Sequence, residues 1–230
     1  MFDPHIHMYS RTTDDYDAMS KAGIVMYDRI SKSLWSQALG EGIVGKYAGV
    51  KLDRIPFDVA YWKDWKQLYP NSKVLSRDTG SARPYGADPY GDYYTSPDVL
   101  FPISNKDTRL GLKDTVVGLE YDGANKAYNI QDVQKKKVIN DQIGKESVAL
   151  FSLYPLMARV FDSSVNGQTL IFEYNSTSYT FTDKQTRSQW NFEGKSIEGQ
   201  MKGKQLLRLP FDEGFWFEWA AFHPGTKIYS

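Results

Sequence analysis

The stretch that decides the organisation of this chain is residues 28–76, because a second version of it returns near the other end. The first stretch reads DRISKSLWSQALGEGIVGKYAGVKLDRIPFDVAYWKDWKQLYPNSKVLS, and residues 183–230 read DKQTRSQWNFEGKSIEGQMKGKQLLRLPFDEGFWFEWAAFHPGTKIYS. Trp35 and Trp190 lie 155 positions apart, and the glycine, proline and tryptophan landmarks that follow lie 154 apart. One deletion therefore aligns the two stretches over their whole length, which predicts an internal repeat of one structural unit.

The composition is that of an ordinary globular chain with one unusual number. Its 230 residues are enough to bury a core, and Lys+Arg and Asp+Glu balance at 28 each, so we expect no nucleic-acid partner. Cysteine is absent, which excludes disulfides and thiolate catalysis. Aromatic residues reach 15%, which is typical of an aromatic-rich β core or of a stacking surface for a sugar or peptide.

The sequence shows no apolar run long enough to span a membrane and no apolar signal-peptide core at its start. At face value the expected location is the cytoplasm, although an intact parent protein could be exported. The expected partner is a small molecule, a glycan or a protein.

The fold class that the patterns predict is mainly β (α+β): two related β-rich units with short helices, of which the first is incomplete. In both stretches an Asp precedes an aromatic segment that stops at a proline, which predicts helices over 58–70 and 212–224 with the Asp as N-cap. Turn residues at 122–123 and 166–167 join apolar segments. We expect strands over 24–27, around 34–35, and over 116–121, 126–130, 148–153, 157–161, 169–174 and 178–181.

Four parts follow from this pattern along the chain. Residues 1–23 form one strand and one helix, and residues 24–76 form the back half of a first repeat unit. A connection rich in proline, tyrosine and glycine occupies 77–114, and a complete second unit occupies 115–230. The first unit is incomplete because a β meander precedes the second repeated stretch but not the first.

Four segments distributed over most of the chain carry a resemblance to a known family: VMYDRISKSLWSQALGEGIVG, VLSRDTG, RPYGADPYGDYY and FWFEWAAFHPGTKIY. Through them residues 24–230 resemble the family catalogued as domain of unknown function 3179. Members of the family look like tandem copies of one β-rich unit, so the resemblance implies the same architecture for this chain.

The chain departs from that family in its first unit. The family's first unit typically has a front half with a His-Glu-Ile-Val-Asn-Asp-like stretch and a Cys-Pro-Leu-Cys-like motif, and that half is missing here. The equivalent stretches of the second unit are Lys137-Val138-Ile139-Asn140-Asp141 and Tyr154-Pro155-Leu156-Met157, without histidine or cysteine. Any thiol redox chemistry that the motif implies for the family has lost its reactive group in this chain.

The first 23 residues, with the segment FDPHIHMYSRTTDDYDAMSKAGIV, resemble the opening of a TatD-like metal-dependent hydrolase. The resemblance breaks off near Gly23, which we interpret as the junction of a chimeric chain. His5 and His7 could bind a divalent metal, because alternate strand residues point to one side. A hydrolytic site needs further ligands, and His223 is the only other histidine. We therefore expect no cofactor beyond a divalent metal held weakly by this incomplete pair.

Two other sets of residues are candidates for function. The connection contains tyrosines that could stack on a ligand, and carboxylates that could bind calcium although their spacing matches no EF-hand. Packing between the units is an alternative role for the tyrosines. The repeated Asp, Ser and Trp positions, 28 and 183, 33 and 188, 35 and 190, are better explained by turns than by catalysis. The tyrosines are Tyr85, Tyr90, Tyr93 and Tyr94, and the carboxylates are Asp88, Asp92 and Asp98.

The sequence thus predicts an uncharacterised β-rich domain with a non-catalytic binding or structural role. The alternative is a redox or metal-dependent enzyme whose active half is missing from this chain.

Overall fold

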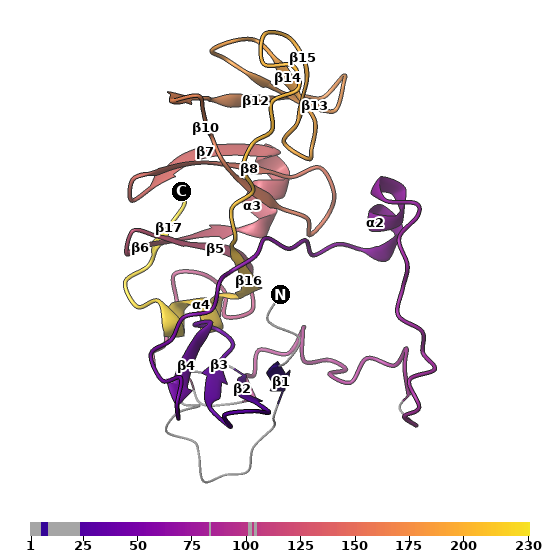
Figure 1. Ribbon diagram of the computed structural model, residues 1–230, viewed down its shortest axis with the longest axis vertical. Coiled ribbons are helices and arrows are strands. Elements are labelled where there is room, and N and C mark those ends of the chain that lie inside the picture. Colours follow the sequence, from indigo (N-terminus) through magenta and orange to yellow (C-terminus); the bar gives the residue numbers. More distant parts are fainter. Residues whose placement is uncertain (1–5, 9–23, 83, 101–102, 104) are drawn as a thin grey trace.

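The computed structural model describes residues 6–8, 24–82, 84–100, 103 and 105–230, and it shows a mainly β protein. Figure 1 shows a small sheet at each end of the long axis, two further sheets between them, and helix α2 standing to one side. Within the described part of the chain, none of the helices has the length and apolar character needed to cross a membrane.

The two end sheets have the same topology. Each is a four-stranded antiparallel meander, and in each the register shifts at the tryptophan of the third strand, Trp35 or Trp190. The first sheet consists of β1 (Ile6–Met8), β2 (Val25–Asp28), β3 (Leu34–Ser36) and β4 (Glu41–Val44). The second consists of β12 (Phe172–Asn175), β13 (Thr180–Asp183), β14 (Gln189–Trp190) and β15 (Ser196–Glu198).

An aspartate organises the turn after the second strand of each end sheet. The Trp35 indole donates to Asp28 Oδ2 at 3.3 Å, and the Trp190 indole donates to Asp183 Oδ2 at 2.9 Å. Each carboxylate also accepts the backbone N–H three residues later. The structural role expected for these aspartates is confirmed, because their oxygens serve the turn and the neighbouring indole.

A glycine closes against a serine in each end sheet. Ser33 and Ser188 are fully buried, and Gly45 and Gly199 have φ values of 95° and 91°. A Cβ on either glycine would lie within 3.0 Å of the facing serine. Both the left-handed backbone and the close approach require glycine, which explains why the same residue stands in both stretches.

The centre of the molecule consists of two sheets that pack face to face around an apolar core. One has the strand order β16-β5-β6-β17 and the other β7-β8-β9. The shared core includes Val117, Leu119, Ile139 and Leu150. The hairpin predicted around the turn at 122–123 is confirmed, and the turn predicted at 166–167 joins two short paired strands, residues 164–165 and 168–169. The strands are β5 (Thr115–Tyr121), β6 (Ala124–Asn129), β7 (Val138–Ile143), β8 (Glu146–Phe151), β9 (Arg159–Asp162), β10 (Ser164–Val165), β11 (Gln168–Thr169), β16 (Asp212–Phe215) and β17 (Lys227–Ile228).

The sequence patterns missed helix α3 (Ile130–Lys136) and strand β7 after it. Asn129 caps the helix by accepting the Gln131 N–H at 2.9 Å, and Ile130 and Val133 are buried. At the end of the helix Lys137 has a φ of 64°, which turns the chain into β7. An Asn cap followed by apolar residues three apart was a usable signal for this helix.

The predicted helices over 58–70 and 212–224 are shorter than expected. They are α2 (Trp62–Leu68) and α4 (Trp216–Phe222), and their N-cap residues make no side-chain capping bond. Asp58 and Asp212 therefore do not cap them. Both aspartates lie before the helices, Asp212 as the first residue of β16, and they bind arginine side chains instead.

Both helices carry a tryptophan that fixes the chain beyond them. The Trp219 indole donates to Thr226 Oγ1 at 3.0 Å, and the Trp65 indole donates to Ser72 Oγ at 2.9 Å. Trp219 is buried against β5, where a Cβ on Gly118 would lie 2.3 Å from its ring. Trp65 is half-buried and packs on the apolar core of the second half of the chain.

Two ion pairs connect the repeated stretches, each between an arginine of one stretch and an aspartate of the other. Arg54 Nη1 lies 2.8 Å from Asp212 Oδ2, and Arg208 Nη2 lies 3.1 Å from Asp58 Oδ1. Arg54 and Arg208 are 154 positions apart, as are Asp58 and Asp212. Each stretch therefore gives its arginine to the aspartate of the other stretch.

Phe57 and Phe211, which are also 154 positions apart and directly precede the two aspartates, stack on each other. Their ring centroids lie 4.8 Å apart with an interplanar angle of 23°. Asp58 binds a second guanidinium, because Arg159 Nε donates to Asp58 Oδ1 at 2.9 Å. The Asp58 side chain is 7% exposed, whereas that of Asp212 is 38% exposed.

The substitution Asp58→Asn should lower the free energy of unfolding by about 3–5 kcal/mol, because it leaves the buried Arg159 and the partly buried Arg208 without a counter-charge. The matched change Asp212→Asn, at the more exposed position, should cost at most about 1 kcal/mol. Denaturant unfolding of both variants measures the difference. Equal losses would contradict the view that Asp58 is the principal link.

Trp219→Ala should lower the free energy of unfolding by about 3–5 kcal/mol, because it removes a buried ring that fills the space above Gly118. Trp65→Ala should cost less, since Trp65 is half-buried. The same denaturant titration measures both, and a larger loss for Trp65 would show that α2 rather than α4 carries the packing.

Candidate functional site

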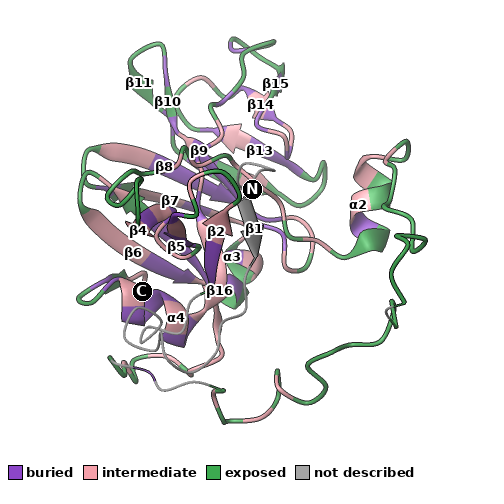
Figure 2. Cartoon of the chain, turned by 60° about the horizontal axis from the view of Figure 1, so that its bottom comes forward, coloured by how far each residue is buried: buried purple, intermediate pink, exposed green. Residues whose placement is uncertain are grey.

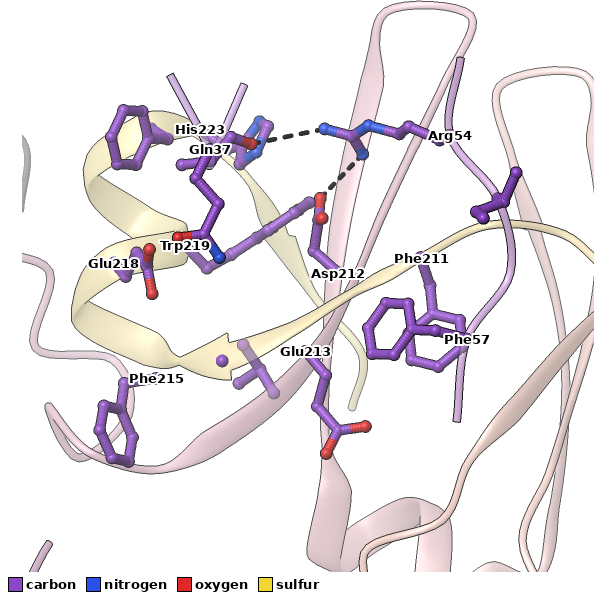
Figure 3. Close-up of a pocket in the computed structure, with 15 residues that line it drawn as sticks. Gln37, Arg54, Phe57, Phe211, Asp212, Glu213, Phe215, Glu218, Trp219 and His223 are labelled. Atoms are coloured by element: carbon purple, nitrogen blue, oxygen red, sulfur yellow. Dashed lines mark hydrogen bonds and ion pairs between the residues drawn. The ribbon is translucent and has the colours of Figure 1, made fainter. Parts of the chain in front are cut away.

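A pocket of about 380 Å³ lies where α4 meets the first repeated stretch. Figure 3 shows Arg54, Gln37 and His223 on one side of it, and Asp212 and Glu218 facing them. Its walls combine aromatic and aliphatic side chains with three carboxylates, one arginine and one histidine. The lining residues are Gln37, Ala38, Arg54, Ile55, Phe57, Val116, Phe211, Asp212, Glu213, Gly214, Phe215, Glu218, Trp219, Phe222 and His223.

Strand β16 and helix α4 position the polar groups of the pocket. Successive residues of a strand point to opposite sides, so Asp212 and Glu213 leave β16 in different directions. Figure 3 shows Asp212 directed at Arg54 and Glu213 directed away from it. Glu218 extends from α4 back toward Gly214, where an added Cβ would lie 3.3 Å from Glu218 Oε2.

Arg54 reaches the pocket from the first repeated stretch. Its Nη1 donates to Asp212 Oδ2 at 2.8 Å, and its Nη2 donates to the Ala38 carbonyl at 3.5 Å. These two bonds hold the guanidinium against the pocket wall. Because the partners come from different parts of the chain, the pocket exists only when the two stretches are assembled.

Burial shifts the carboxyl groups of the pocket toward their neutral forms. It raises the pKa of Glu213 to about 8, with a further contribution from the charge of Asp58. Glu213 Oε2 is buried and has no hydrogen-bond partner among the described residues. Burial also raises the pKa of Asp212, against the opposing effect of Arg54, and that of Glu218, which faces Asp212. At neutral pH Glu213 is therefore largely protonated and able to donate a hydrogen bond.

His223 is neutral at physiological pH. Burial lowers its pKa to about 4, with a smaller opposing effect from Glu120. The ring lies against Trp219, with centroids 3.8 Å apart. A neutral imidazole has one donor and one acceptor nitrogen, so His223 can bind either kind of ligand group.

The histidines proposed as metal ligands are only partly within the described residues. His5 lies outside them, and His7 stands in β1 opposite Tyr27. The metal hypothesis for this pair stays a prediction. Across the described ranges, no three His, Asp or Glu side chains come together as a metal site, and Asp88, Asp92 and Asp98 therefore do not form the calcium site considered from sequence.

The four candidate tyrosines lie on the connection, which follows the outside of the molecule as a long, largely exposed segment (Figure 2). Tyr85, Tyr90 and Tyr94 are exposed. Lys113 Nζ lies 3.6 Å from the centroid of the Tyr93 ring. Tyr93 and Tyr94 each contact Phe215, which also lines the pocket. A stacking role for the four tyrosines stays a prediction, and two of them contact a residue that lines the pocket.

The stretches equivalent to the family's His and Cys motifs have structural contacts here. Asn140 in β7 bonds to the backbone of Phe172 twice, accepting at 2.7 Å and donating at 2.9 Å. Met157, between β8 and β9, is fully buried in the core. In this chain both positions hold the second end sheet against the central sheets.

Sequence reasoning missed Arg54, Glu213, Glu218 and His223 as pocket residues. The recurrence of Arg54 as Arg208 was a usable signal, since it marks the residues that connect the two stretches. No local pattern reveals Glu213 or Glu218, because their environment depends on the assembled pocket.

The arrangement defines a β-rich protein with a mixed polar and aromatic pocket between two related stretches. The chain belongs to the family described as protein of unknown function (DUF3179), whose model matches residues 2–226. The family identification from sequence is confirmed, and the match includes nearly all of the first 23 residues. Their resemblance to a TatD-like hydrolase stays a prediction. Searches of curated proteins and of solved structures found no match.

Glu213→Gln should change how the stability of the protein depends on pH. Because the folded-state pKa of about 8 exceeds the ordinary value of 4.5, Glu213 favours the folded state below pH 4.5, and this contribution is lost as the pH rises to 8. The uncharged variant should therefore gain about 1–3 kcal/mol over the original protein at pH 8, and little at pH 4.5. Denaturant unfolding across this window, with Glu198→Gln as an exposed control, measures the effect. A constant difference at all pH values would contradict the raised pKa.

Proposed function

We propose that this chain is a non-catalytic binding module whose ligand site is the pocket between Arg54 and α4. The observation that carries the proposal is the pocket itself, about 380 Å³ in volume, with aromatic walls and convergent polar groups. Sites for small ligands typically combine an apolar lining with a few placed polar groups. A small molecule, or one side chain of a protein partner, fits this volume better than an extended glycan.

We also infer that the two stretches are copies of one unit and that the first copy lacks its front half. Trp216 in α4 is 0% exposed against the β5–β6 hairpin, whereas its counterpart Trp62 in α2 is 48% exposed. Strand β16 pairs with β5, but the corresponding residues 58–61 pair with no strand in the described part of the chain. Both differences are expected if the hairpin of the first unit is missing.

The four-part division of the chain is retained within this proposal, with one qualification. Strand β1 pairs with β2, so a strand from residues 1–23 completes the first end sheet. It takes the place that β12 has in the second sheet. A segment of different origin can therefore serve as the first strand of the repeated unit.

The alternative is an enzyme. The feature that favours it is that Glu213 and His223 both line the pocket and have pKa values shifted in opposite directions, a combination typical of acid–base catalysis. Redox or metal-dependent chemistry, as considered from the sequence, stays a prediction. In a binding module the same two groups serve as neutral hydrogen-bonding groups.

A panel of cationic, neutral and anionic small compounds should contain ligands that change the intrinsic tryptophan fluorescence of the protein, through Trp219 at the pocket wall, and raise its melting temperature. Gln37→Trp, at the pocket wall, should abolish both effects, whereas the matched change Gln131→Trp on α3 should not. Ligands that bind Gln37→Trp unchanged would locate the site elsewhere. Turnover of a bound compound would favour the enzyme alternative.

A further inference from the structure

The pocket has a counterpart elsewhere in the molecule. The positions that correspond to Arg54, Asp212 and His223 in the other stretch are Arg208, Asp58 and Tyr69. In the pocket the guanidinium of Arg54 binds Asp212, and in the counterpart that of Arg208 binds Asp58. The two sites therefore share an arginine–aspartate ion pair at equivalent positions.

The counterpart site is filled by the side chain of Arg159, which is buried. Its Nε and Nη2 donate to Asp58 Oδ1 and Oδ2 at 2.9 and 3.1 Å, a bidentate pair. Its Nη2 also donates to the Tyr69 hydroxyl at 2.9 Å, and its Nη1 donates to the Phe192 carbonyl at 3.5 Å. The guanidinium carbon lies 4.5 Å from the centroid of the Phe192 ring. A guanidinium is thus bound on its edge and on its face.

In the pocket, the corresponding partners are present without such a guanidinium. The described hydrogen bond of Asp212 uses Oδ2, and its side chain is 38% exposed. His223 stands at the Tyr69 position and can accept a hydrogen bond through its unprotonated nitrogen. Gln37 corresponds to Phe192 through the 155-residue shift that also relates Trp35 to Trp190. The pocket therefore has polar partners for the edge of a guanidinium, and an amide where the counterpart has an aromatic face.

The charged groups of the pocket also favour a guanidinium as ligand. Asp212 and Glu218 line the pocket together with one arginine, Arg54, whereas the Glu213 side chain leaves β16 in the other direction (Figure 3). In the counterpart, Asp58 balances Arg159 and Arg208 together within hydrogen-bond distance. A second cation beside Asp212 would complete the same arrangement, with Glu218 also lining the pocket. A carboxylate paired with a guanidinium forms strong, directional hydrogen bonds.

We propose that the pocket binds a guanidinium group on an alkyl chain, with Asp212 as its bidentate partner and His223 as an acceptor. The proposal rests on the pocket being a ligand site, and it names the chemical class of the ligand. The group can come from a free arginine derivative or from an arginine in an extended peptide. Arg159 itself belongs to strand β9, so a peptide with the sequence of β9 is the natural second probe.

The test uses capped arginine (N-acetyl-arginine methylamide) and the capped tripeptide Arg-Val-Phe, each beside the same compound with citrulline in place of arginine. Citrulline keeps the shape of the side chain and removes the charge. Calorimetric titration should show that at least one arginine probe binds at least tenfold more tightly than its citrulline match. Binding by both arginine probes would assign recognition to the guanidinium alone, and binding by the tripeptide alone would assign it to an arginine within a strand.

Asp212→Asn should weaken the arginine probes at least tenfold, whereas the matched change Asp132→Asn on the exposed face of α3 should leave them unchanged. Gln37→Trp, which keeps every charge of the pocket, should also block binding, so the result does not depend on one variant folding. Equal affinity for arginine and citrulline, or arginine binding that survives both pocket variants, would overturn the proposal. If other compounds bind the original protein and lose their binding in Gln37→Trp, but neither arginine probe binds, the pocket remains a ligand site and the guanidinium assignment is wrong.

Discussion

Asp58 is the residue on which the assembly of this molecule depends. Its carboxylate binds Arg159 from the central sheets and Arg208 from the second repeated stretch, and it is almost completely removed from solvent. A buried carboxylate between two guanidiniums is stable only while all three groups remain in place. The cluster therefore fixes the first stretch on the second half of the chain, and it brings α2 onto the apolar core beside it.

The pocket lies beside the other ion pair between the repeated stretches, that of Arg54 and Asp212. Arg54 crosses to Asp212 in the reverse direction, and Phe57 and Phe211, each next in sequence to one of the two aspartates, stack on each other. One site is largely buried and filled by a side chain, and the other contains a cavity. The difference lies in what occupies the space beside each aspartate: Arg159 beside Asp58, and the cavity beside Asp212.

The sequence predicted those features that depend on neighbouring residues. The Asp28 and Asp183 turns, the hairpin at 122–123 and the ends of both short helices before proline were all readable, because the residues that cause them lie within a few positions. The role of Asp58 and Asp212 was misread as helix capping. Their real partners lie 150 and 158 positions away, and a local pattern contains no information about such a pairing. The pocket was missed for the same reason.

The crossed ion pairs have a consequence for how such a chain could arise. Arg54 meets Asp212 while Arg208 meets Asp58, and equivalent phenylalanines meet each other, which is the self-complementary pattern of a two-fold symmetric homodimer. If the two stretches are copies of one unit, their contact is a subunit interface retained within a single polypeptide. Fusion removes the requirement that both halves stay identical. One aspartate could then become a purely structural partner, while its equivalent kept a cavity beside it.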